Sequence, residues 1–293
     1  MLIHRLLTTA LAITLVTACG PPRRDRIVIG SKNFTEQLLL GEIIAQQIGN
    51  KTHLPVERRF YLAGSYICHQ AIVAGRIDIY PEYTGTALTA ILKLPPSKDP
   101  RQVYEMVERE YQSRFNLKIG PNLGFNDTFA LEIRGDDARR LNLKTISDAV
   151  PHAVHWRAGF GYEFMERPDG YKSLAAAYGL RFAENPRIMD LGLLARALKE
   201  RQIDLGAGNT TDGLIPALDL FVLEDDKHYF PPYEAVPIVR REALSAHPEL
   251  AQALAGLARK ISDAEMRDLN YQVDGRHRDA KQVAAEFLRN KGL

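Results

Sequence analysis

Two stretches of the chain end a short apolar run in side chains that can hold a small polar ligand. The first, Ile77–Thr86, ends in an aromatic and hydroxyl-rich turn, and the second, Ile203–Gly213, follows 126 residues later with the same design. Aligning their starts places Tyr83 against Asn209. Ligands collect beyond the carboxyl ends of buried parallel strands, so we expect the two stretches to form opposite rims of one cleft. A chance likeness is the alternative, because a helix, a short strand and a turn often follow one another in α/β proteins.

Lys32 is a candidate anion ligand near the start of the chain. It lies in a turn between an expected strand, Ile27–Gly30, and an expected helix, Leu38–Ile48. A helix N-terminus beyond a strand end attracts anions, and the lysine adds a full charge there. Asn33 and Glu36 have the spacing of a capping box, with asparagine in place of the usual serine or threonine. A solvated lysine in a turn is the alternative that this stretch leaves open.

Acid–base catalysis would need ionisable groups that meet in a cleft, and the sequence offers Lys32, Glu82, Glu163 and Asp212. No nucleophile elbow, phosphate loop or metal-ligand spacing accompanies them in the sequence. The two histidines of His152–Trp156 would face opposite sides of the strand predicted there, a spacing that suits no metal. An enzyme is therefore the weaker hypothesis, and we expect neither a cofactor nor a metal.

Alternating strands and helices must position these side chains. Residues 27–80 predict strand, helix, strand, helix, strand, which requires parallel pairing with right-handed crossovers. An amphipathic helix follows over Arg101–Phe115. The second half is predicted to continue as helix, strand, helix, strand over Leu174–Tyr178, Leu180–Ala183, Leu191–Glu200 and Ile203–Leu205.

Two extended segments, Thr128–Ile133 and Tyr229–Tyr233, are where we expect the chain to cross between two lobes. The prolines of the second segment prevent a helix there. Lobe one is predicted to comprise residues 27–125 and 231–293, and lobe two residues 126–230. The C-terminal part is predicted to be helical, and its short loops favour packing on lobe one; these helices are expected at Pro248–Lys260, Asp263–Tyr271 and Asp279–Asn290.

The N-terminus is similar to a bacterial lipoprotein signal. A short apolar run, Leu6–Val16, precedes small residues and Cys19, and it is shorter than the roughly 20 apolar residues of a membrane span. Residues 1–18 are therefore predicted to be a signal peptide, Cys19 a lipidated N-terminus, and residues 19–26 a polar tether. An ordinary secretory signal and a cysteine buried in a core helix are the alternatives.

Charge and cysteine content restrict the class of protein. The chain has 38 basic and 36 acidic side chains, and loss of residues 1–18 removes one arginine, which leaves 37 against 36. A chain so close to neutral has no nucleic-acid footprint. The remaining 275 residues reach the size at which one domain tends to become two. Cys68 would be the sole cysteine inside the mature chain, so no internal disulfide is possible, and we expect a buried small hydrophobe.

Five segments in order resemble one family, the substrate-binding proteins of ABC importers for osmoprotectants such as glycine betaine, choline and carnitine. The resemblance covers residues 27 to 293 and implies the bilobal periplasmic-binding-protein fold, with two Rossmann-like lobes joined by two crossing segments. It also implies a monomer tethered outside the cytoplasmic membrane that delivers its ligand to an ABC permease and its ATPase. The segments are Gly30–Gln37, Tyr80–Thr86, Glu166–Gly170, Leu223–Lys227 with Pro231–Tyr233, and Leu269–Asp274.

In that family a quaternary ammonium lies in a box of four aromatic rings, normally tyrosines. A trimethylammonium group has no N–H to donate, and ring faces attract it while they desolvate its methyl groups. The resemblance implies that the box positions are Tyr83, Phe129, Asn209 and Tyr233, and that Thr86, Lys32 and Arg167 meet the ligand's carboxylate.

Two box positions depart from the family pattern. Phe129 keeps a ring without the hydroxyl, whereas Asn209 has no ring and lies among small residues. One cation–π contact contributes roughly 0.5 to 2 kcal/mol, so its loss can weaken binding by about tenfold or more when the contact lies at the upper end of that range. The departure favours either weak binding of the usual betaines or a larger, more polar betaine-like ligand such as ergothioneine. A ligand sensor with the same cleft is a further alternative.

Overall fold

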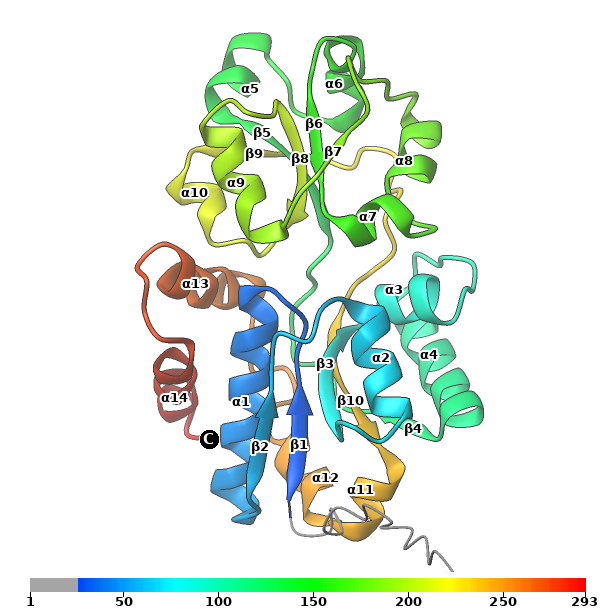
Figure 1. Cartoon of the computed structure of the whole chain (residues 1–293), viewed down its shortest axis with the longest axis vertical. Helices are drawn as coiled ribbons and strands as arrows, with labels where there is room; N and C mark the ends of the chain where they lie inside the picture. Colours follow the sequence, from blue (N-terminus) through cyan, green and yellow to red (C-terminus); the bar gives the residue numbers. More distant parts are fainter. Residues whose placement is uncertain (1–25) are drawn as a thin grey trace, which may run out of the picture.

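The computed structural model describes residues 26–293, which form two α/β lobes with a sheet in each (Figure 1). The sheet of lobe one has five strands in the order β2-β1-β3-β10-β4. The first three strands along the chain run parallel, whereas β10 is antiparallel to both of its neighbours. The strands are β1 (Ile27–Gly30), β2 (Val56–Arg59), β3 (Ile79–Tyr83), β4 (Leu117–Ile119) and β10 (Ala235–Arg240).

The sheet of lobe two repeats this arrangement position by position. Its order is β7-β6-β8-β5-β9, with β6, β7 and β8 parallel and β5 antiparallel to both of its neighbours. Strand β8 therefore corresponds to β3, and β5 corresponds to β10. The predicted bilobal α/β fold is confirmed. The strands are β5 (Phe129–Arg134), β6 (Ala158–Phe160), β7 (Arg187–Ile188), β8 (Leu205–Asn209) and β9 (Leu220–Leu223).

The repeat found in the sequence has a physical basis in two aspartates. In lobe one, Asp78 precedes β3, its N–H donates to the Val28 carbonyl at 2.7 Å, and its Oδ2 accepts from the Val28 N–H at 2.9 Å. Arg240, at the end of β10, donates to its Oδ1 at 2.9 Å. Asp78 thus joins the beginning of β3 to β1 and to the end of β10.

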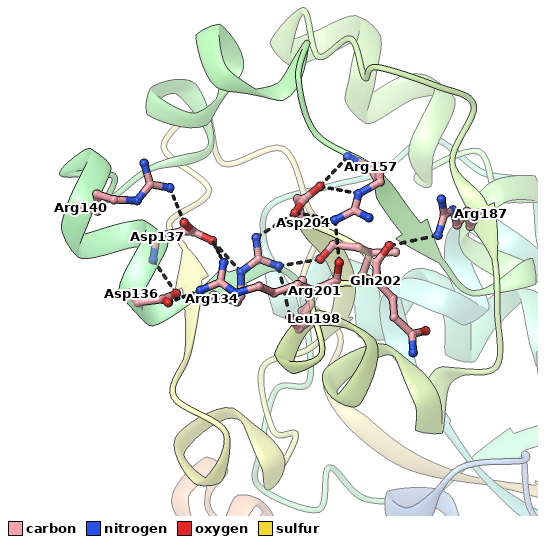
Figure 2. Close-up of polar contacts among 11 residues, drawn as sticks. Arg134, Asp136, Asp137, Arg140, Arg157, Arg187, Leu198, Arg201, Gln202 and Asp204 are labelled. Atoms are coloured by element: carbon pink, nitrogen blue, oxygen red, sulfur yellow. Dashed lines mark hydrogen bonds and ion pairs between the residues drawn. The ribbon is translucent and has the colours of Figure 1, made fainter.

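Asp204 makes the corresponding contacts in lobe two (Figure 2). Its N–H donates to the Arg157 carbonyl at 2.7 Å, and its Oδ2 accepts from the Arg157 N–H at 3.0 Å. Arg134, at the end of β5, donates to its Oδ1 at 2.8 Å and to the Ile203 carbonyl at 2.7 Å. Because Arg134 is only 8 % exposed, these acceptors satisfy a buried cation.

The helices of lobe one cover both faces of its sheet. Helix α1 (Thr35–Thr52) packs against the C-terminal helices α12 (Glu249–Ala255), α13 (Asp263–Asp274) and α14 (Ala280–Lys291). Helices α2 (Ser65–Val73) and α4 (Pro100–Phe115) enclose a second core that contains the buried Cys68. This lobe also contains α3 (Thr84–Thr86), the π-helical segment Ala87–Ile91 and α11 (Arg241–Ala246).

Shorter helices surround the sheet of lobe two, which lies at the top of Figure 1. In this lobe α9 packs against β5, β6, β8 and β9. The helices are α5 (Gly135–Leu141), α6 (Ile146–Ala153), α7 (Tyr162–Glu166), α8 (Tyr171–Tyr178), α9 (Leu191–Lys199) and α10 (Leu214–Ala217).

Residues 120–128 and 224–234 are the two crossing segments that join the lobes, and they contact each other. The Asp127 N–H donates to the Tyr233 carbonyl at 3.1 Å, and the Asn126 side chain accepts from the Tyr233 N–H at 2.6 Å. Asn126 and Glu234 also form an antiparallel bridge. The connection between the lobes is therefore a paired double strand.

Three local predictions were wrong. His152 lies in the last turn of α6, which a Thr145–Asp148 capping box begins, so His152–Trp156 is not a strand. Leu180–Ala183 is also not a strand; Leu180 packs into the core, and β7 forms further along the chain. Asn33 does not cap α1, because the helix begins after Phe34 and the Glu36 side chain makes tertiary hydrogen bonds instead.

None of the helices within residues 26–293 is both long enough and apolar enough to cross a membrane. The predicted signal peptide, Cys19 and most of the predicted tether fall in residues 1–25, outside the described residues.

Candidate functional site

A cavity of about 480 Å³ lies between the lobes, and all seven predicted site residues line it. Lys32, Tyr83 and Thr86 come from lobe one, and Tyr233 comes from the second crossing segment. The other three, from lobe two, are Phe129, Arg167 and Asn209. Sequence reasoning did not single out several other lining residues, among them Asp127, Phe164, Met189 and Leu191.

Tyr83 ends strand β3 and is almost fully buried, at 4 % exposure. Its hydroxyl donates to Glu36 Oε1 at 2.6 Å, which fixes the orientation of the ring. Burial, followed by the nearby Glu36 carboxylate, raises the pKa of Tyr83 well above its usual value, so the ring remains a neutral phenol. The Lys32 ammonium lies 4.6 Å from the ring centroid.

Lys32 lines the cavity, but its charge is already compensated. Its ammonium forms an ion pair with Glu82, and both side chains are almost fully buried. The same Glu82 oxygen accepts from the Tyr83 N–H at 2.8 Å. Lys32 therefore contributes one member of a buried pair rather than an isolated positive charge at the turn.

Arg167 is the second buried cation, and it connects the two lobes. Its guanidinium forms a bidentate pair with Asp169 at 2.8 and 2.6 Å and donates to Thr86 Oγ1 at 2.9 Å. Asp169 also accepts from Thr89 at 2.8 Å and from the Tyr233 hydroxyl at 2.5 Å. Burial alone would raise the pKa of Asp169, but Arg167 outweighs burial and holds it below its usual value.

Aromatic rings form one wall of the cavity. The Phe129 centroid lies 4.7 Å from that of Phe164 and 5.6 Å from that of Tyr233. Phe230 packs behind them, with its centroid 5.7 Å from that of Phe129. The Arg167 guanidinium carbon is 4.9 Å from the Phe129 centroid, so this wall already includes a cation–π contact.

Asn209 ends β8 and lies directly opposite Phe129 in the sheet. Its side-chain amide donates to Asp127. The Thr211 hydroxyl lies 2.7 Å from Asp127 Oδ1 and 2.5 Å from Glu36 Oε2. A continuous chain of polar contacts thus runs from Tyr83 through Glu36, Thr211 and Asp127 to Asn209, and it spans the two lobes.

Glu36 and Asp127 form a carboxyl pair that no cation among residues 26–293 neutralises. Burial raises the pKa of both groups, and for Asp127 the proximity of Glu36 raises it further. One hydroxyl proton of Thr211 cannot satisfy two carboxylates. The geometry and the direction of both pKa shifts therefore fit one additional proton shared by the pair.

The four acid–base candidates do not meet at one point. Lys32 and Glu82 neutralise each other, and Asp212 does not line this cavity. Glu163 lines it and contacts Gly64 of lobe one, where an added Cβ would lie 2.2 Å from Glu163 Oε1. Within residues 26–293 no group of three or more potential ligand side chains could hold a metal ion.

Comparisons with known proteins agree on one family. Residues 25–290 match the family described as the substrate-binding domain of the ABC-type glycine betaine transport system. The chain is 37 % identical to a carnitine transport binding protein of Listeria monocytogenes, covering 97 % of this chain and 93 % of that one. It is 36 % identical to a glycine-betaine-binding protein of Pseudomonas aeruginosa, again with 97 % and 93 % covered.

A third relative differs in length and in named ligand. The chain is 37 % identical to the ergothioneine transport permease/ergothioneine-binding protein of Helicobacter pylori over 91 % of its own length, and it spans about half, 48 %, of that protein. Among solved structures, that of a glycine betaine/carnitine/choline ABC transporter matches with a TM-score of 0.75 and 34 % identity. This match covers 91 % of the chain and 98 % of the solved one.

Proposed function

The chain belongs to the substrate-binding domains of ABC-type glycine betaine transport systems, and we propose that it binds a quaternary-ammonium zwitterion for delivery to an ABC permease and its ATPase. This is a transport family and not an enzyme family, and substrate-binding proteins of ABC importers act outside the cytoplasm. One observation carries the proposal. A single cavity between the lobes is lined by the rings of Tyr83, Phe129 and Tyr233 together with a buried arginine.

The proposed pose follows from the groups that remain able to bind. The ammonium lies against Tyr83, Tyr233 and Phe129, whose ring faces replace water around its methyl groups. Thr86 accepts from Arg167, which leaves the Thr86 hydroxyl proton to donate to a ligand carboxylate. Arg167 and Lys32 line the same cavity, but each is already paired with a carboxylate, so Thr86 is the group proposed to donate to the ligand.

The second candidate is a larger or more polar betaine-like ligand in the same cavity, such as ergothioneine. Two observations favour it: Asn209 stands where the family resemblance implies a ring, and the Helicobacter pylori relative is named for ergothioneine. A ligand sensor would use the same cleft, and ligand uptake by cells with and without the intact gene distinguishes sensing from import.

Calorimetry with glycine betaine, choline, carnitine and ergothioneine tests the function. At least one should bind, and the double variant Tyr83→Ala, Tyr233→Ala should lose about a hundredfold in affinity, the value of two cation–π contacts of about 1.4 kcal/mol each. Tyr66→Ala, an exposed tyrosine that does not line the cavity, is the matched control. Full affinity in the double variant would rule out an aromatic ammonium site.

We further propose that residues 1–18 are removed, that Cys19 carries lipid, and that residues 19–26 tether a monomer with lobes at 27–125 plus 231–293 and at 126–230. The support is the short apolar run that ends in small residues before Cys19. Metabolic labelling with a palmitate analogue should mark the wild type and spare Cys19→Ala. Equal labelling of both proteins would contradict the anchor.

A further inference from the structure

A second, smaller cavity of about 110 Å³ adjoins the main cavity. The two cavities share the lining residues Asn33, Phe34, Leu191 and Asn209. Residues from both lobes line this side chamber, with Glu36, Asn270 and Asp274 from lobe one and Thr211 and Asp212 from lobe two. It therefore lies on the far side of Asn209, between the same two rims.

The charged side chains that line the side chamber are all acidic. Three carboxyl groups line it, from Glu36, Asp212 and Asp274, and no lysine or arginine of the described chain does. Asn270 is only 3 % exposed, and its amide nitrogen donates to Glu36 and to the Thr211 carbonyl, each at 2.9 Å. Its Oδ1 has no hydrogen-bond partner among residues 26–293, although a buried acceptor ordinarily has one.

The small residues at the end of β8 leave open a passage between the main cavity and the side chamber. Gly208, which also lines it, lies against Glu132, whose Oε1 would be 2.3 Å from an added Cβ, so a larger side chain does not fit there. Asn209 follows as a short polar residue, whereas the corresponding position of lobe one has the ring of Tyr83. A ring at position 209 would stand between the two cavities.

The space exceeds what a small aliphatic betaine fills. The main cavity alone has the volume of about sixteen water molecules and the side chamber that of about four, at ~30 Å³ for each water. Carnitine and glycine betaine have no N–H group to offer the acceptors beyond Asn209. A ligand that reaches the chamber must bring donors, because buried acceptors without them disfavour binding.

Resting on the proposed function, we infer that the side chamber binds a second end of the ligand and that this end carries N–H donors. The substrate class is a quaternary-ammonium zwitterion with an N–H heterocycle or amine attached. Its ammonium lies against the rings of the main cavity, while its N–H groups donate to Asn270 Oδ1 and to the carboxylate of Asp212. Asp212 and Asn270 are thus specificity-determining residues.

Two matched probes test this inference by calorimetry: the trimethylated betaines of histidine and of phenylalanine. Both have the same ammonium and carboxylate and a ring on the same stem, but only the histidine ring has an N–H. We expect histidine betaine to bind at least about tenfold more tightly, the value of one hydrogen bond to a charged acceptor. Equal affinities would overturn the inference.

Two variants locate the discrimination. Asp212→Ala and, separately, Asn270→Ala should reduce the ratio of the two affinities to about threefold or less. Asp99→Ala is the matched control, because Asp99 and Asp212 each accept from the N–H two residues ahead, at 2.9 and 2.7 Å, but Asp99 lines neither cavity. The control should keep the wild-type ratio. A ratio that persists in both test variants would contradict the chamber as its source.

Glycine betaine separates this inference from the proposed function. If glycine betaine binds and neither ring-bearing probe does, the chamber inference fails while the function stands. If none of the three binds and ergothioneine, choline and carnitine also fail, the proposed function fails with it.

Discussion

The strands that end at Tyr83 and Asn209 are held by the same set of aspartate contacts, which we call the shared frame. They differ in the side chain that each presents to the cleft. Asp78 and Asp204 fix the starts of β3 and β8 through the same three kinds of contact, to a neighbouring backbone N–H, a carbonyl and an arginine. Beyond that frame, β3 ends in an aromatic ring and β8 in a short amide. The difference shows that core contacts determine where the rims lie and leave the rim residues free to set ligand preference.

The two sides of the cleft also differ in whether their carboxyl groups are paired with a cation. On one side of the cleft, Arg167 and Asp169 cross to Thr86 and Tyr233 as a compensated ion pair. On the other side, Glu36 and Asp127 meet at Thr211, and no cation of the described part of the chain is paired with them. The first contact resists changes of pH, and the second depends on a proton.

The largest expected effect breaks the shared frame. Asp204→Ala leaves Arg134 buried without one of its carboxylates, and we expect a loss of about 3 kcal/mol in the free energy of unfolding. Asp78→Ala should cost less, about 1 to 2 kcal/mol, because the partner side chain of Arg240 is 22 % exposed. Urea unfolding measures both losses.

Glu105→Ala, which removes an exposed ion pair with Arg101, is the control and should change stability by less than about 0.5 kcal/mol. If Asp204→Ala behaved like this surface variant, the frame would not depend on the aspartate.

The second-largest effect is expected from a variant that gives both strand ends an aromatic ring. Asn209→Tyr restores a ring opposite Tyr83, so it should tighten glycine betaine binding by about tenfold, the value of one cation–π contact. The same ring fills the passage to the side chamber and should weaken histidine betaine by at least about tenfold. Calorimetry of both ligands with both proteins measures the reversal, and a change of the same sign for both would contradict it.

The smallest effect concerns the proton on the uncompensated side. Burial between the lobes raises the pKa of Glu36 and of Asp127. The closed state therefore binds more protons than an open state in which these carboxyl groups are exposed to water. Rising pH should therefore favour lobe opening, measured as an increased radius of gyration in small-angle scattering without ligand.

The Asp212 carboxyl group should lose its stabilising proton over a similar rise in pH. Burial raises its pKa to about 6, so the stability linked to its protonated form is present below the unfolded value near 4 and is lost as pH rises through about 6. Thr211→Ala, which removes the hydroxyl between the two carboxyls, should change the pH dependence of scattering. Replacement of Thr89, on the compensated side, should leave it unchanged.

Much of the fold could be predicted because it follows from periodicity and repetition. The Ile77-Asp78 and Ile203-Asp204 units are local patterns, and their alignment pairs Tyr83 with Asn209, which are the last residues of β3 and β8. The seven site residues line one cavity. Five of them could be predicted from short local segments that resemble the family, whereas Phe129 and Asn209 lie outside those segments and depart from the family's tyrosines.

The unpredicted features depend on contacts that are distant in sequence. Glu36 has capping-box spacing, yet its side chain binds Tyr83, Thr211 and Asn270, up to 234 residues away. Phe164 could not be assigned to the site from the sequence, because nothing in its local sequence shows that it packs on Phe129. His152–Trp156 alternates like a strand, but the capping box at Thr145 carries the helix through His152.

The pairing of the crossing segments affects the rate at which a ligand escapes. Tyr233 supplies a ring of the cavity, while its backbone bonds Asn126 and Asp127 in the other segment. The same few residues thus line the ligand cavity and pair the two crossing segments between the lobes. Ligand release requires the lobes to separate at these paired segments. Ligands of different affinity should therefore share one upper limit on their dissociation rate. Stopped-flow displacement would show this limit as a plateau, and rates that exceed the rate of lobe opening would exclude such gating.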